Sequence, residues 1–133
     1  MFQTLIAEDN AVFRQSLREV LARRFPFMEI NEAIDGEQAL FQGTAHHHDL
    51  IFLDIKMPML NGLAVTRAIK TRDREAVICL VTSYDLQEYR DAADVCGVDH
   101  FIVKDESTES LIVSVVERVI AARGLAVTGM TAD

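Results

Sequence analysis

The sequence predicts an α/β fold, a doubly wound (βα)5 domain whose parallel five-stranded sheet lies between two helical layers. Two observations predict it: short apolar runs alternate five times with amphipathic stretches, and each run ends in polar or charged residues. The 133 residues fall within the usual size of one domain, which buries roughly two-thirds of its unfolded surface. Five strands, each followed by a helix, then imply right-handed crossovers.

The first strand–helix unit is predicted over residues 5–25. Its strand, Leu-Ile-Ala, ends in Glu8 and Asp9. Asn10 can cap the helix, which must end before Pro26 because a residue that precedes proline is pushed out of the helical region. The apolar face of this helix is expected to hold Phe13, Leu17, Val20 and Leu21.

The second unit combines a half-exposed strand with a short helix. Residues 28–33, Met-Glu-Ile-Asn-Glu-Ala, alternate apolar and polar side chains, which is typical of an edge strand. Asp35 and Gly36 then form a turn into the helix. This helix contains Ala39, Leu40 and Phe41.

The third unit contains the most apolar strand. Residues 50–53, Leu-Ile-Phe-Leu, are uninterrupted, as expected of a central parallel strand covered on both faces, and they stop at Asp54. A loop through Pro58, Asn61 and Gly62 leads into the third helix. This helix contains Leu63, Ala64 and Ile69.

The fourth and fifth strands are again short apolar runs. Residues 77–81 end in Thr82 and Ser83, and residues 101–103 end in Lys104. Between them we predict a weaker helix from about residue 86 to residue 96, which Gly97 can terminate.

The fifth helix is predicted over about residues 108–123. One broad apolar face is expected to hold Leu111, Ile112, Val115, Val116, Val119 and Ile120. Residues 124–133 show no period and are expected to fray or to begin a linker. The domain is therefore expected to cover residues 1–123.

Composition excludes several classes of protein. The net charge of −8, from 21 acidic and 13 basic residues, would repel nucleic-acid backbone and anionic lipid, so this domain is not expected to bind DNA directly. No apolar run approaches the roughly 20 residues that span a bilayer, and a cytoplasmic location is expected. Cys79 and Cys96 fit no metal-ligand spacing and are predicted to be reduced core thiols. Residues 46–48, three consecutive histidines, are predicted to form a solvated loop.

Polar side chains follow the strands at the points where the apolar runs stop. Glu8 and Asp9 follow the first strand, Asp54 the third, Thr82 the fourth and Lys104 the fifth. Because parallel strands end at the same edge of a sheet, these side chains are expected to converge where open α/β sheets bind ligands.

This order of residues resembles the receiver domain of two-component response regulators. Residues 54–58, Asp-Ile-Lys-Met-Pro, followed by Asn61 and Gly62, look like the loop after the phosphoacceptor in that family. The resemblance covers about residues 3–122 and implies a flavodoxin-like sheet of order 2-1-3-4-5, in which the strand at residues 28–33 is an edge.

One departure narrows the resemblance. Asp105 follows Lys104 where many members have proline, which is similar to the receivers of helix-turn-helix (LuxR/NarL-type) transcriptional regulators. The chain is then either a stand-alone receiver or part of a longer transcription regulator, and we favour the second.

The receiver interpretation includes a metal site. Clustered carboxylates repel one another and are tolerable mainly when a cation binds, and oxygen ligands with room for water suit Mg²⁺. We assign Asp9 and Asp54 as direct ligands, the Lys56 backbone carbonyl as a third protein ligand, and Glu8 as a ligand directly or through water.

The resemblance also implies the chemistry. Asp54 would attack the phosphorus of a phosphohistidine or a small phosphodonor to give an aspartyl phosphate, with Mg²⁺ and Lys104 neutralising the equatorial oxygens. The Thr82 hydroxyl and the Ser83 backbone N–H would hydrogen-bond the phosphoryl oxygens. Inward movement of Thr82 would open space for Phe101, which biases the surface of the fourth helix, fifth strand and fifth helix.

Partners follow from the same resemblance. It implies a sensor histidine kinase or phosphotransfer protein as phosphodonor, an output domain in a longer chain, and a phosphorylation-promoted homodimer. The chain would catalyse only its own phosphorylation and dephosphorylation.

Two alternatives fit the sequence less well. A phosphatase of the haloacid-dehalogenase type needs a second Asp where this chain has Lys56. A pseudo-receiver that binds partners without phosphorylation usually lacks one of the acidic or lysine positions, all of which are present here.

Overall fold

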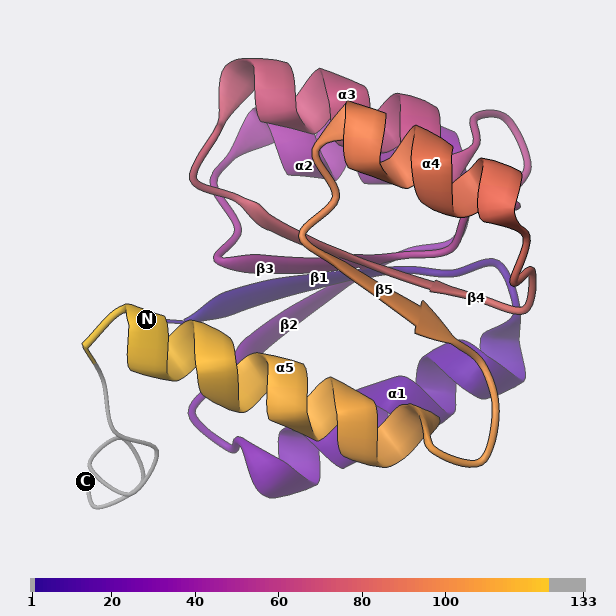
Figure 1. Cartoon of the computed structure of the whole chain (residues 1–133). Helices are drawn as coiled ribbons and strands as arrows, with labels where there is room; N and C mark the ends of the chain where they lie inside the picture. Colours follow the sequence, from indigo (N-terminus) through magenta and orange to yellow (C-terminus); the bar gives the residue numbers. More distant parts are fainter. Residues whose placement is uncertain (1, 125–133) are drawn as a thin grey trace.

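The computed structural model describes residues 2–124 as a parallel sheet between two helical layers (Figure 1). The strands are β1 Gln3–Ala7, β2 Glu29–Ala33, β3 Leu50–Leu53, β4 Val77–Thr82 and β5 His100–Val103. The helices are α1 Ala11–Arg24, α2 Gly36–Ala45, α3 Gly62–Arg72, α4 Gln87–Cys96 and α5 Thr108–Ala122. The strand order is β2-β1-β3-β4-β5, which confirms the predicted fold class and order.

The core has two parts, one on each face of the sheet. Helices α1 and α5 cover one face, and α2, α3 and α4 cover the other (Figure 1). Alternate residues of the central strand serve the two parts: Phe52 packs in the cluster that includes Leu21 and Val116, whereas Ile51 packs in the cluster that includes Ile69. All four residues of β3 are buried, as its uninterrupted apolar run predicts.

Helix ends lie where the capping signals predict them. The Asn10 side chain accepts a hydrogen bond from the backbone N–H of Phe13, and α1 ends at Phe25, directly before the proline. Asp35 caps α2 in the same way. Gly97 ends α4 with a φ of 89°, the left-handed conformation that glycine adopts without steric cost.

The edge strand β2 is charged and partly covered. Among the described strands it pairs only with β1. Glu32 of β2 forms ion pairs with two arginines of α1, at 2.9 Å with Arg14 and 2.7 Å with Arg18. Ile30 and Glu32 therefore share the face under α1, where Ile30 packs against the core, while Asn31 and Ala33 lie on the opposite face.

Two predictions of burial are wrong in part. Leu111 is 44% exposed, and Val113 packs into the core in its place. The face of α5 that meets the sheet is centred on Ile112 and Val116, so position 111 lies at its solvent-facing margin. Cys79 is a buried core thiol whose pKa burial raises, but Cys96 is only half-buried, so it is not a core thiol.

The solvated-loop prediction is wrong for one of the three histidines. His46 and His47 are exposed, but His48 is 1% exposed, and its Nε2 lies 3.2 Å from the Asn31 side-chain nitrogen on β2. Asn31 has only donors on that nitrogen, so the neutral ring accepts through Nε2. Burial, together with the neighbouring histidines, lowers the pKa of His48 to about 4.

The buried His48 gives a pH dependence of stability. The unfolded chain takes up a proton near pH 6.5, whereas the folded chain resists protonation down to about pH 4. The contribution of neutral His48 is therefore present above pH 6.5 and is lost as pH falls toward 4. From pH 7 to pH 5, the free energy of unfolding should fall by about 2 kcal/mol more in the wild type than in His48→Gln, which keeps an acceptor for Asn31.

Urea unfolding at the two pH values measures this difference. The control is Val95→Gln, which replaces an exposed residue away from the three histidines, changes no titratable group and should follow the wild type. Identical pH dependence in wild type and His48→Gln would contradict a buried neutral ring.

Two further expectations concern the tail of the chain and membrane-spanning segments. Of the predicted tail, residues 124–133, only Gly124 lies within the described residues. In the described part of the chain, every helix is too short or too polar to cross a membrane.

Candidate functional site

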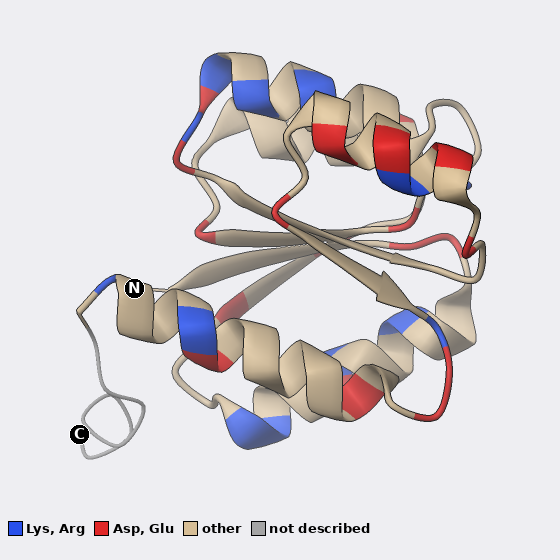
Figure 2. Ribbon diagram, in the orientation of Figure 1, with Lys and Arg blue, Asp and Glu red and all other residues tan. Residues whose placement is uncertain are grey.

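The candidate site lies at the carboxyl edge of the sheet, on the loops that leave the strands. Glu8 and Asp9 follow β1, Asp54 follows β3 and Lys104 follows β5, while Thr82 is the last residue of β4. Figure 2 shows acidic loop segments after the strands at this edge. The arrangement follows from the parallel register, because Leu53 pairs with Leu80 and Thr82 pairs with Val103.

Three carboxylates form the centre of the site. Ligand oxygens of Glu8, Asp9 and Asp54 all lie within 4.8 Å of one another. Glu8 and Asp54 are 2% and 7% exposed, whereas Asp9 is open to solvent. Two of the three charges are therefore withdrawn from water, which makes a compensating cation necessary.

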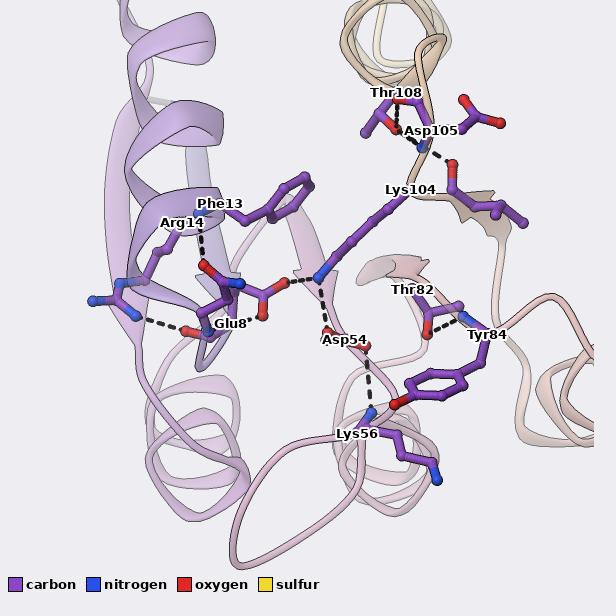
Figure 3. Close-up of polar contacts among 12 residues, drawn as sticks. Glu8, Phe13, Arg14, Asp54, Lys56, Thr82, Tyr84, Lys104, Asp105 and Thr108 are labelled. Carbon is purple, nitrogen blue, oxygen red and sulfur yellow. Dashed lines mark hydrogen bonds and ion pairs between the residues drawn. The ribbon is translucent and has the colours of Figure 1, made fainter.

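The Lys104 ammonium is the cation that the protein itself provides. Its Nζ lies 2.6 Å from Glu8 Oε1 and 3.0 Å from Asp54 Oδ2, so it bridges the two buried carboxylates (Figure 3). Burial alone would lower the pKa of Lys104, but the bonds with Glu8 and Asp54 outweigh it and leave this pKa raised. Burial raises the pKa of Glu8, against the opposing effect of the Lys104 hydrogen bond.

Backbone hydrogen bonds hold the carboxylates in place. Asp54 N–H donates to the Ala7 carbonyl at 3.1 Å, and Lys56 N–H donates to Asp54 Oδ1 at 3.3 Å. The second oxygen of Glu8, Oε2, accepts from Asn10 N–H at 3.1 Å. Because Oε1 binds Lys104, both oxygens of Glu8 are engaged.

The loop after Asp54 is shaped by two close backbone approaches. Gly62 N–H donates to the Ile55 carbonyl at 2.8 Å, and a Cβ at Gly62 would lie 2.2 Å from the Asp54 carbonyl oxygen. Gly36 N–H donates to the Pro58 carbonyl at 3.0 Å, and a Cβ there would lie 2.0 Å from a Leu60 oxygen. Only glycine fits at either position, which ties the acceptor loop to the starts of α2 and α3.

The residues predicted as a switch lie on β4 and β5. Thr82 is fully buried, and its hydroxyl oxygen accepts from Tyr84 N–H at 3.2 Å. Ser83, directly after it, is exposed. Phe101 is half-buried, and the guanidinium of Arg90 stacks 4.5 Å from the centroid of its ring.

The structure thus brings four predicted residues together, Glu8, Asp9, Asp54 and Lys104, with Thr82 on the adjacent strand end. Phe101 contacts Arg90 of α4 and packs against the core cluster on that face of the sheet. Sequence reasoning missed Phe13, whose ring centroid lies 4.3 Å from Lys104 Nζ. Its position on the apolar face of α1 predicts a core residue and gives no sign of the lysine contact.

The fold and the clustered carboxylates and lysine at its carboxyl edge define the class of the protein, a receiver-type signalling domain. Residues 4–116 match the family described as "Response regulator receiver domain". The chain belongs to this family, whose members are phosphoacceptor domains of two-component systems.

Two relatives described as transcriptional regulatory proteins support the assignment to this family. Transcriptional regulatory protein PrrA of Mycobacterium leprae (strain TN) is 32% identical over 102 residues, which are 77% of this chain and 43% of that protein. Transcriptional regulatory protein DegU of Brevibacillus brevis is 27% identical over 122 residues, 92% of this chain and 51% of that protein. The chain therefore spans about half the length of the curated relatives it matches.

A solved structure agrees in fold. Response regulator TrrA of Thermotoga maritima, described in complex with Mg²⁺-BeF, has a TM-score of 0.77 at 30% identity. The match covers 90% of this chain and 99% of that chain.

Proposed function

We propose that Asp54 accepts a phosphoryl group from a phosphohistidine of a sensor kinase or phosphotransfer protein. The observation that carries the proposal is the Lys104 ammonium, which bridges Asp54 and Glu8 at the buried end of the central strand. A carboxylate oxygen of Asp54 attacks phosphorus as the bond from phosphorus to the imidazole nitrogen breaks, and the imidazole leaves with the electron pair.

The donor set fits Mg²⁺. Asp9, Asp54 and the Lys56 backbone carbonyl would hold the ion, while Glu8 would act through water because Lys104 and Asn10 already occupy its oxygens. Bound Mg²⁺ would neutralise charge on the phosphoryl oxygens. Support comes from TrrA, which is described with Mg²⁺-BeF.

The remaining groups would receive the phosphoryl oxygens. Lys104 would turn its ammonium from Asp54 toward one oxygen, since the carboxylate loses its negative charge on phosphorylation. The Thr82 hydroxyl accepts from Tyr84 N–H and keeps its own proton to donate to a second oxygen. The Ser83 backbone N–H, at the next position, would donate to the same group.

Phosphorylation would then act on Phe101 through Thr82. When Thr82 moves toward the phosphoryl group, space opens for the Phe101 ring, which must leave the Arg90 guanidinium to enter it. Arg90 is itself held by Asp85 at 2.7 Å in the loop that starts at Ser83. The surface of α4, β5 and α5 therefore changes as one unit.

The output would be control of transcription by a further domain. PrrA and DegU are described as transcriptional regulatory proteins and are about twice as long as this chain. Residues 1–123 would be the receiver and residues 124–133 the start of a linker. A phosphorylation-promoted homodimer would bring two output domains together.

The test is intact-protein mass after incubation with acetyl phosphate and Mg²⁺. We expect a gain of about 80 Da, one phosphoryl group, in the wild type and none in Asp54→Asn or without Mg²⁺. Asp91→Asn, on the exposed part of α4, is the matched control and should react normally. No gain in the wild type, with no binding of beryllofluoride, would favour the pseudo-receiver instead.

A further inference from the structure

Phe13 contacts the reactive end of Lys104. The Phe13 ring centroid lies 4.3 Å from Lys104 Nζ, and Figure 3 shows the ring beside the lysine side chain. Phe13 belongs to α1, which covers the opposite face of the sheet from α3, the helix that follows the acceptor loop. Within the part of the chain that the structure describes, the ammonium therefore has two carboxylate partners, Glu8 and Asp54, and one aromatic neighbour, the Phe13 ring.

The position of the Phe13 ring is itself fixed. Phe13 lies in the first turn of α1, where its N–H donates to the Asn10 side chain at 3.1 Å. The ring is half-buried and packs against the core cluster under α1 and α5. The cap fixes the backbone of Phe13 and the core packing fixes its ring, so the ring can restrict the conformations of a flexible side chain beside it.

A lysine side chain stays in one place only when its neighbours restrict its conformations. Its four-carbon stem has many rotamers. Unless water is excluded, the ammonium can therefore turn away from a carboxylate and bind water instead. An aromatic face attracts an ammonium electrostatically, and the attraction grows as water is removed. The Lys104 side chain is 15% exposed, so its ammonium is largely desolvated.

The attraction of a ring has another property that hydrogen bonds lack. This attraction does not depend on the directions of the three N–H bonds, so it persists when the ammonium turns from Asp54 toward a phosphoryl oxygen. Glu8 and Asp54 compete for the ammonium, but the ring restrains it without competing for its protons.

We propose that Phe13 is a positioning residue for phosphoryl transfer, which confines the Lys104 ammonium to the acceptor site while the ammonium exchanges its partner. This role rests on the proposed function of Asp54. The Phe13 ring has no oxygen or nitrogen that could bind Mg²⁺ and acts through Lys104, so its loss should slow transfer and leave Mg²⁺ binding unchanged.

The test compares three side chains at position 13. Phe13→Leu keeps apolar bulk without an aromatic face, and Phe13→Tyr keeps the face. At saturating acetyl phosphate and Mg²⁺, followed by intact-protein mass, we expect Phe13→Leu to be roughly 10-fold slower than the wild type and Phe13→Tyr to be within about twofold of it. Leu17→Val, a core change on the same helix, controls for loss of stability.

A second measurement does not need phosphorylation. In the unphosphorylated protein, the ring should shift the NMR signals of the Lys104 ε-methylene protons, and Phe13→Leu should abolish the shift while Phe13→Tyr preserves it. Equal rates for Phe13→Leu and wild type, or equally slow Leu and Tyr variants, would overturn the positioning role. A wild type that takes up no phosphoryl group would overturn the proposed function of Asp54 instead.

Discussion

Replacement of Lys104 with methionine is expected to slow phosphorylation of Asp54 by roughly 10²- to 10³-fold. The ammonium lies 3.0 Å from Asp54 and is the protein's own positive charge among three clustered carboxylates. Methionine keeps a four-atom unbranched stem and removes the ammonium group together with its hydrogen bonds to Glu8 and Asp54. The rate constant at saturating acetyl phosphate, from the time course of intact-protein mass, measures the effect.

The same substitution should weaken the metal-free fold. Without the ammonium, Glu8 and Asp54 stay buried with no counter-charge, and breaking a buried ion pair typically costs about 3 kcal/mol. A bound divalent cation can take over the neutralisation, so Mg²⁺ should raise the melting temperature more in Lys104→Met than in the wild type.

Lys70→Met is the matched control for both effects. Lys70 also forms an ion pair, with Asp99 at 2.9 Å, but on the surface and far from the carboxylates. Its loss should change stability by less than about 1 kcal/mol and leave the rate unchanged. A Lys104 variant that reacted as fast as Lys70→Met would contradict the assigned role of the ammonium.

Replacement of Gly62 with alanine is expected to lower the free energy of unfolding by roughly 3 kcal/mol or more. The added Cβ would lie 2.2 Å from the Asp54 carbonyl oxygen and 2.9 Å from its carbonyl carbon. These are backbone atoms at the end of a central strand, so they cannot move aside as a flexible side chain would. Thermal unfolding should show a midpoint lowered by on the order of 10 °C.

Gly97→Ala separates steric overlap from backbone strain. Gly97 has a φ of +89°, but the nearest atom to its Cβ would be 3.8 Å away on the Lys70 side chain. This variant should lose only about 1 kcal/mol, the cost of the left-handed conformation. Equal losses in the two variants would contradict a tight contact between Gly62 and the acceptor strand.

Much of the fold could be predicted because parallel strands leave a strong pattern in a sequence. A strand buried on both faces is an apolar run, and Leu50–Leu53 is buried at every position. Since such strands end at one edge, the neighbourhood of Glu8, Asp54 and Lys104 could be predicted with no knowledge of any contact.

Contacts between distant side chains could not be predicted in this way. His48 is buried against Asn31 of β2, a residue distant in the sequence, whose side chain offers it a hydrogen bond. The contact of Phe13 with Lys104 depends on a rotamer of each and on how α1 packs against β1 and α5. Leu111 and Val113 exchange places because the rotation of α5 about its axis is decided by packing.

The paired charges on β2 are expected to disfavour aggregation through the edge of the sheet. An edge strand offers backbone N–H and C=O groups to any passing strand, which makes it a starting point for cross-molecular sheets. Here a second strand would meet Glu32 and the two guanidinium groups that hold it, Arg14 at 2.9 Å and Arg18 at 2.7 Å. A neighbouring strand would partly desolvate these three charged groups, and that cost would oppose the gain from new backbone hydrogen bonds, so joining of sheets edge to edge is expected to be disfavoured.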